Sequence, residues 1–391
     1  MTLLSVKPFH ICFNLTLLAI SLPVLAQHSS RSLLRASSFT QSGENTRLRK
    51  YFEILGRFEH ERSVTDSIFL KTNLLAISNT SNESTVSPIA SPWRSKSLQR
   101  IWHQPKATKS IAVDQLYLTY EANEITLKTG RFPINLSSTN VFSPNDLFQP
   151  YYATQFYRTY KPGVDGLRIS RYYDYAGRIE FIGVAGYSHT TDENNNFDAE
   201  DSAYLALWAD AYNSLDFQLV AGNVSDFNIA AVGAQMPLTH VTLRGEANAK
   251  KVIRNTQSRK IGQTDKQLVL GIEGQIFAEL MFGLEKYYNH RGTDQGSLPQ
   301  RNAEPNTSWQ PYLAKNYTSA HGSLILSGVS TLQLLTIIND YNNATLSSLY
   351  LNLSTSDNTE VSIGMSHGRG PSTNEFKLAG KSASLSIGSY F

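Results

Sequence analysis

The chain has 391 residues, a formal net charge of +3 and a single cysteine, Cys12. A net charge this small gives no sign of a nucleic-acid partner, and one cysteine cannot form an internal disulfide. Charged residues make up 17% of the chain, below the roughly 25% usual for soluble domains. Tyrosine and phenylalanine are abundant, with 20 and 18 residues.

Residues 1–26 have the pattern of a secretory signal peptide. Lys7 precedes an apolar run from Ile11 to Leu25, and Val24 and Ala26 put small residues at the third and first positions before a cut. The run is short for a membrane span, although an uncleaved anchor is the alternative. We predict cleavage after Ala26, export, and a mature chain without cysteine or cofactor.

Residues 27–46 are polar and without period, which predicts a flexible periplasmic leader. From 47 to 391 the chain is a succession of strand-length segments in which apolar and polar residues alternate, the period of a half-buried strand. In the hairpin around Ala122, for example, Leu116, Leu118 and Tyr120 share one face. Similar segments lie at about 51–64, 166–187, 215–235, 241–250, 267–288, 314–328, 330–339, 344–353, 358–366 and 381–391.

The connections between these segments alternate in length. Short turns are expected near 123, 174, 211, 237, 277, 329 and 355, and long polar loops at about 78–110, 133–160, 188–200, 250–264, 290–312 and 367–380. Outer-membrane barrels have this arrangement, with the short turns in the periplasm.

The predicted fold class is therefore all-β: a single transmembrane antiparallel up-and-down β-barrel. About seventeen segments are visible, and closure favours an even number. Either one segment is wrongly assigned or one strand is hidden in 84–100, so we expect 16 or 18 strands. A soluble β-sandwich or solenoid is the alternative. The segments show no constant repeat length, which disfavours a solenoid, and the alternating connections favour the barrel over a sandwich.

The stretch from Thr129 to Gly166 is the most informative. It contains four prolines, all turn formers, and many aromatic rings. A loop folded inward, packing its rings on the barrel wall and narrowing the lumen, explains both. The rings could also form a sliding surface for sugars or aromatic acids, although such rings are more often core or interfacial girdle. The aromatic residues assigned to this loop are Phe142, Phe148, Tyr152, Phe156, Tyr157 and Tyr160.

Charged residues on the polar faces of the strands are candidates for a selective field in a pore. The alternative is that they pair with each other and only hold the wall in shape. They are Lys128, Arg168, Glu180, Arg244, Glu246, Glu273 and Glu285.

One run of residues consists of Leu116-Tyr117-Leu118, Gly130-Arg131, Asn135, Phe142, Pro144 and Asp146. This run resembles a signature of porin-like outer-membrane proteins of proteobacteria. The likeness extends from about Tyr51 to the end of the chain. It implies a porin-type channel constricted by residues 131–160, with Arg131, Asn135 and Asp146 in the constriction. It names no substrate. The final strand, ending in Phe391, is similar to the signal that the barrel-assembly machinery reads, except at Ser389.

Other chemistry is sparse. The acidic stretch 192–201 lacks the glycine and distal glutamate of a calcium loop, so a solvated loop is expected. No Ser/His/Asp spacing marks an enzyme. We predict an outer-membrane channel for passive or substrate-preferring diffusion of small polar solutes. A non-transporting barrel in adhesion or envelope structure is the alternative. The expected partners are outer-membrane lipid, lipopolysaccharide and the assembly machinery, in a monomer or homotrimer.

Overall fold

A computed structural model describes residues 28–42, 49–80, 91–99, 101–103, 109–148, 160–174, 176–187, 196–255, 260–293, 312–372 and 374–391. The predicted signal peptide lies outside these residues, as do Tyr152, Phe156 and Tyr157. No helix in the described part is long and apolar enough to cross a membrane.

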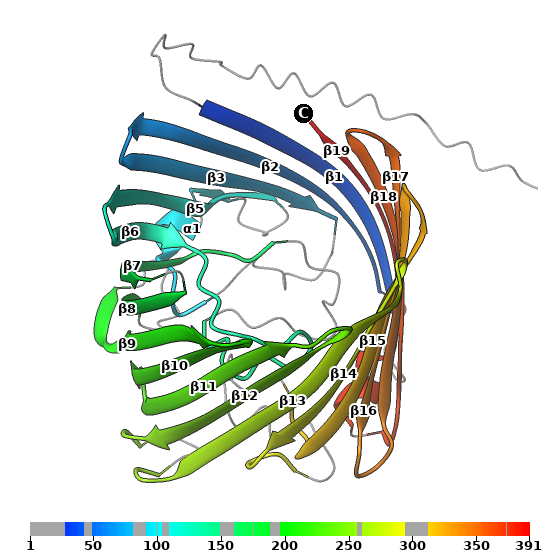
Figure 1. The fold of residues 1–391 in the computed structure, drawn as a ribbon. Coiled ribbons are helices and arrows are strands. Elements are labelled where there is room, and N and C mark those ends of the chain that lie inside the picture. The colour runs from blue at the N-terminus through cyan, green and yellow to red at the C-terminus, as the bar shows by residue number, and fades with distance from the viewer. Residues whose placement is uncertain are drawn as a thin grey trace, which may run out of the picture.

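The described residues are almost entirely β-strand (Figure 1). The strands are β1 (His28–Ser42), β2 (Arg49–Thr65), β3 (Ile68–Asn79), β4 (Trp102–His103), β5 (Lys109–Ala122), β6 (Ile125–Phe132), β7 (Val164–Tyr173), β8 (Gly177–Tyr187), β9 (Phe197–Tyr212), β10 (Leu215–Val224), β11 (Phe227–Pro237), β12 (Val241–Val252), β13 (Thr264–Phe277), β14 (Leu280–Asn289), β15 (Asn316–Ser327), β16 (Ser330–Asn339), β17 (Thr345–Ser356), β18 (Thr359–Arg369) and β19 (Lys381–Tyr390). Two short helices are described, α1 (Lys96–Gln99) and α2 (Glu375–Ala379).

These strands form one closed antiparallel ring. Each pairs with its neighbour in the chain, β3 pairs directly with β5, and β1 closes the ring by pairing with β19. The two-residue β4 only adds to the free edge of β5, so the barrel has 18 strands. The predicted fold class and the larger of the two predicted strand numbers are confirmed.

The flexible leader is the wrong prediction, because residues 28–42 form β1. This strand pairs with β2 from His28 to Gln41 and with β19 from Leu33 to Ser42. It is also the strand that was sought in 84–100, where the described residues form a turn and α1. Serines occupy both of its faces and blur the alternation, but the backbone hydrogen bonds to two neighbours do not require apolar side chains.

The barrel is apolar outside and polar inside. On β13, Leu270 faces outward with 59% of its surface exposed, while Gln267 faces inward and is buried. Apolar residues inside the barrel occur in two clusters, where the chain after β6 packs against the wall. The acidic stretch is partly described: residues 197–201 begin β9 rather than lying in a loop.

Short turns lie at the predicted places to within three residues. Several begin with a residue in the left-handed region, such as Asn123 (φ 50°), Asp174 (φ 61°) and Asn213 (φ 54°). Asn and Asp tolerate this conformation, and tight hairpins favour it because it matches the twist of the strands.

Ala36→Pro tests whether β1 is a wall strand. Ala36 lies between Ile54 of β2 and Ile387 of β19. Proline removes an N–H from this ladder and leaves its partner carbonyl unsatisfied, at about 1–3 kcal/mol. We expect less heat-modifiable, folded barrel on semi-native gels, while Ala36→Val is neutral. A proline variant that folds as well as the wild type would contradict β1.

Candidate functional site

The chain between β6 and β7 enters the space enclosed by the barrel (Figure 1). We call its described residues, 133–148 and 160–163, the infolded segment. They have no regular secondary structure beyond turns and bends, yet Ile134, Leu136, Leu147 and Phe148 are buried against the wall strands. The predicted infolding is therefore present.

Glu246 of β12 holds the first half of this segment. Its buried carboxylate accepts hydrogen bonds from the Ser137 hydroxyl (2.6 Å) and from the backbone amides of Thr139 (2.8 Å) and Asn145 (3.1 Å). The Ser138 amide donates to it as well. A carboxylate that accepts several amides is bound more strongly than a neutral acceptor.

Glu285 of β14 does the same for the next residues. It accepts from the amides of Asn140 (2.7 Å), Val141 (3.1 Å) and Phe142 (2.9 Å), and it is also buried. The amides from 138 to 142 therefore turn toward two wall carboxylates in succession. This explains how an irregular backbone is held away from solvent and at a fixed depth in the barrel.

Neutral groups complete the attachment. Gln218 donates to the Leu136 carbonyl (2.5 Å), and Asn248 donates to the Pro144 carbonyl (2.9 Å). The approach is closest at Gly233, where a Cβ atom would lie 2.5 Å from the Ser138 hydroxyl oxygen. A larger residue there would displace the side chains of Ser138 and Gln218, so the segment lies directly against the strand.

The described rings of the segment are packed rather than presented to solute. Phe142 stacks on Tyr287 at 5.1 Å between ring centroids and meets Tyr312 edge-on at 4.9 Å. Phe148 meets Trp93 edge-on at 5.4 Å. The Tyr160 ring lies under the guanidinium of Arg57 at 3.4 Å. These three rings therefore pack against other side chains and do not form a sliding surface for solutes.

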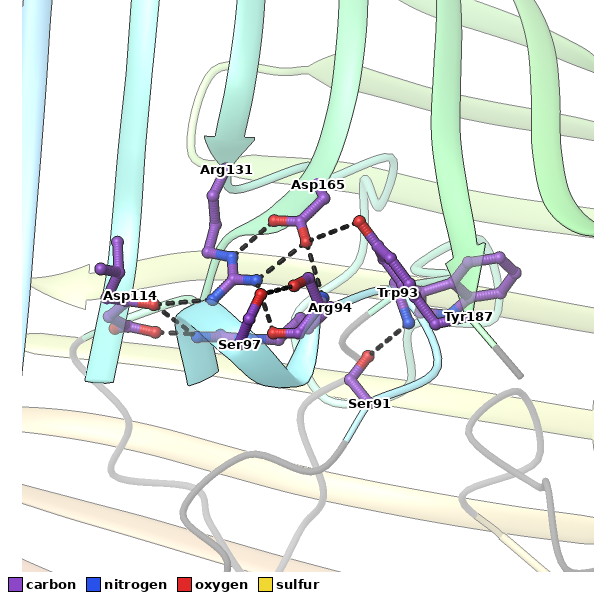
Figure 2. A network of polar contacts seen from close by, with 10 residues as sticks. Ser91, Trp93, Arg94, Ser97, Asp114, Arg131, Asp165 and Tyr187 are labelled. Atoms are coloured by element: carbon purple, nitrogen blue, oxygen red, sulfur yellow. Dashed lines mark hydrogen bonds and ion pairs between the residues drawn. The ribbon is translucent and has the colours of Figure 1, made fainter. Parts of the chain in front are cut away.

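Arg131 is buried in a network at the foot of the segment (Figure 2). Its guanidinium contacts both carboxylate oxygens of Asp165, at 2.5 and 2.8 Å, and donates to the carbonyls of Val113 (2.9 Å) and Ser95 (3.1 Å). With 1% of its surface exposed, Arg131 cannot touch a solute in the lumen. It braces the wall instead.

A second buried pair in the same network fixes the chain before α1. Arg94 binds Asp114 at 3.0 Å and the Val113 carbonyl at 3.1 Å (Figure 2). The Asp165 amide donates to the Trp93 carbonyl at 3.0 Å, and the Tyr187 hydroxyl donates to Asp165 at 3.1 Å. Residues 91–99 and the infolded segment are thus attached to one charged centre.

The remaining predicted site residues lie in different settings. Arg168 and Arg178 both bind Glu180, at 2.5 and 2.9 Å. Arg244 binds Glu273 at 2.9 Å and donates to the Ser138 carbonyl at 3.1 Å. The ammonium of Lys128 lies 5.0 Å from the centroid of the Tyr117 ring. Asp146 pairs with Lys161 at 2.5 Å, and Asn135 accepts from the Ser137 amide at 3.1 Å.

Sequence reasoning left out Asp165, Arg94 and Arg178 from the site, and it named Glu285 only as one of the charges on the polar faces of the strands. One signal was available for Asp165: it lies directly opposite Arg131 when β6 and β7 are paired as neighbours. Nothing comparable marks Arg94, because it lies in a turn outside the strands and no strand pairing places it opposite Asp114.

A cavity of about 420 Å³ lies beside the infolded segment. Its lining combines the segment with the inner face of β8 to β12, and it is polar and partly open. The lining includes Ser137, Ser138, Arg178, Asp210, Asp216, Gln218, Gln235 and Arg244. Among the described residues, no three potential metal ligands lie together.

The fold of this barrel matches solved structures of outer-membrane proteins. No protein-family model and no curated protein sequence matches the chain. The crystal structure of OccK2 (OpdF) from Pseudomonas aeruginosa matches with a TM-score of 0.64 and 10% identity, over 93% of this chain and 97% of that one.

Two further crystal structures match over the same share of this chain. OccAB4 from Acinetobacter baumannii has a TM-score of 0.61 at 10% identity, with 98% of its chain covered. The outer membrane protein OpdK from Pseudomonas aeruginosa has a TM-score of 0.60 at 10% identity, also with 98% covered. A structure of OpdK with vanillate matches with the same score at 9% identity. At these identities the likeness is one of fold.

Glu246→Gln tests the amide-holding role. The variant keeps the shape but loses the charge, and a bond to a charged acceptor is worth about 1.5–3 kcal/mol against about 0.5–1.5 for a neutral one. We expect amide hydrogen exchange at 138, 139 and 145 to quicken about ten-fold. Glu53→Gln, on the inner face of β2, is the matched control. Unchanged protection at these amides would refute the role.

Asp165→Asn tests the buried network. It leaves the Arg131 charge buried without its carboxylate, which costs about 3 kcal/mol or more. We expect a lower midpoint in urea unfolding of the purified barrel. Glu124→Gln removes an exposed pair with Arg171 and should cost less than about 1 kcal/mol. Equal effects of the two substitutions would contradict the network.

Proposed function

We propose that this chain is an outer-membrane channel of porin type, through which small polar solutes diffuse past the infolded segment. The observation that carries the proposal is the attachment of that segment, by Glu246 and Glu285, inside a closed 18-strand barrel. A barrel that served only as an anchor would have no use for a segment fixed across its interior. The likeness to the OpdK and OccK2 folds supports the proposal.

The charges on the inner face of β6 to β8 favour anionic solutes. Lys128, Arg168 and Arg178 provide three positive charges, and Glu180 provides one negative charge. Glu180 is fully buried, whereas Arg168 and Arg178 keep 24% and 34% of their side-chain surface exposed. Solute therefore meets the guanidinium groups, and the excess of positive charge attracts carboxylates.

The cavity beside the infolded segment gives such a solute a place to rest. At about 420 Å³ it accommodates a solute the size of an amino acid or a small aromatic acid. Arg178 and Arg244 give the lining two positive charges, and Asp210 and Asp216 give it two negative charges. Gln218, Gln235 and the Ser137 hydroxyl are arranged around it as neutral polar groups. Vanillate, which is present in one OpdK structure, is a carboxylate of this size.

We also propose that the mature chain starts at Gln27 and that Phe391 is read by the barrel-assembly machinery. Cleavage after Ala26 would leave a single residue before β1. Phe391 exchanges backbone hydrogen bonds with Ser32 of β1, at 2.9 and 3.0 Å, so the residue read during assembly would also lie at the seam. N-terminal sequencing of protein extracted from outer membranes tests the cut.

Single-channel recording in planar bilayers tests the channel and its preference. We expect discrete conductance steps and an anion preference that falls about two- to three-fold in Arg178→Gln, since a unit charge about 7 Å away in water contributes about 0.6 kcal/mol. Arg171→Gln is the control, because Arg171 is exposed near a short turn and pairs with Glu124. The charge of Arg131 is paired with that of Asp165, so the two together add no net charge to this field.

Two outcomes would refute the proposal. Silent bilayers with intact, heat-modifiable barrel would favour the non-transporting role in adhesion or envelope structure. Conductance with the same ion preference in wild type and Arg178→Gln would leave a channel but remove the assigned selectivity.

A further inference from the structure

The outer face of β18 and β19 changes from apolar to cationic toward the long-loop end of the barrel. Odd-numbered residues of both strands face outward, and Met365, Leu385 and Ile387 are more than half exposed there. The next outward positions toward the loops are His367 and Arg369 on β18 and Lys381 on β19.

These three side chains form one cluster. His367 lies opposite Lys381 in the β18–β19 register, and the positive charges of Arg369, Lys381 and Lys377 all act on the His367 ring. Arg369 and Lys381 are exposed and make no hydrogen bond or ion pair with a described residue. Lys50 continues the cationic face two strands further, on the outer side of β2.

No negative charge balances this cluster on the same surface. Among the described residues, the outward positions of β18, β19, β1 and β2 include no Asp or Glu. The contrast is with Lys286 on β14, which has Asp340 at 2.8 Å. Like charges held together without a counter-charge repel one another, so the cluster favours a polyanionic partner.

Exposed lysines occur at outward positions near the long-loop end of other strands, namely Lys109, Lys251 and Lys266. The short turns at the opposite end instead contain acids: Asp66, Glu124, Asp174, Glu279 and Asp357. Acids described near the long-loop end, such as Glu200 and Asp340, are paired with Arg254 and Lys286, so the exposed lysines add to the cationic face there.

We propose that His367, Arg369 and Lys381 bind the phosphate groups of lipid A, the membrane anchor of lipopolysaccharide. Guanidinium and ammonium groups are the donors that phosphate oxygens prefer. The apolar face beneath them, around Met365 and Leu385, would contact the acyl chains. The inference depends on the proposed outer-membrane location with long loops outside, and not on channel activity.

The test is native mass spectrometry of the full-length mature barrel in detergent, titrated with bis-phosphorylated lipid A. The variant Arg369→Gln/Lys381→Gln should bind about ten-fold more weakly, the loss expected when charge-assisted contacts to phosphate are removed. Arg62→Gln, at an outward position near the other end of β2, is the control and should bind as the wild type does. Bilayer conductance of the double variant should be unchanged, which separates this result from failure of the channel proposal.

Three results would overturn the inference. Equal binding of dephosphorylated lipid A would show that the acyl chains alone are recognised. A loss in Arg62→Gln as large as in the double variant would show general electrostatic attraction rather than a site. A wild-type oligomer that the double variant converts to monomer, with lipid binding unchanged, would show that the cluster is a subunit interface.

Discussion

The hydrocarbon of a membrane offers no hydrogen-bond partner, and the rest of this structure depends on that constraint. Every wall strand must be paired on both edges, so the sheet closes and β1 meets β19. Closure fixes one face toward lipid and the other toward the interior, hence the exposed leucines and the buried glutamates. The infolded segment obeys the same constraint, because Glu246 and Glu285 satisfy the amides that no strand pairs.

The sequence was a good guide to the wall wherever the outer face is plainly apolar. Leu268 and Leu270 alternate with polar residues, and that period survives in the structure. It was a poor guide at β1, where serines and arginines dominate. Pairing there is decided by two neighbouring backbones, one of them more than 300 positions away in the chain, and a local pattern cannot reveal this.

The site was only partly readable for a similar reason. The alternation of polar and apolar residues predicted that Glu246 and Arg244 lie on the inner face. The groups that they bind, at and around Ser138, are more than 100 positions away in the chain. Arg131 shows the limit most clearly. A cation at the end of a strand suggested a group facing solute, whereas Asp165 on the next strand and two carbonyls bury it. Burial depends on tertiary contacts that residue type alone does not specify.

The seam between Ser32 and Phe391 has a consequence for biogenesis. These residues are 359 positions apart, so their contact is among the longest-range in the molecule. Local hairpins can form early, but the first strand has an open edge until the last residue has been delivered. Until it closes, the sheet has two unpaired edge strands, which can pair with other chains and aggregate. These edges therefore need protection by another factor until the barrel has closed.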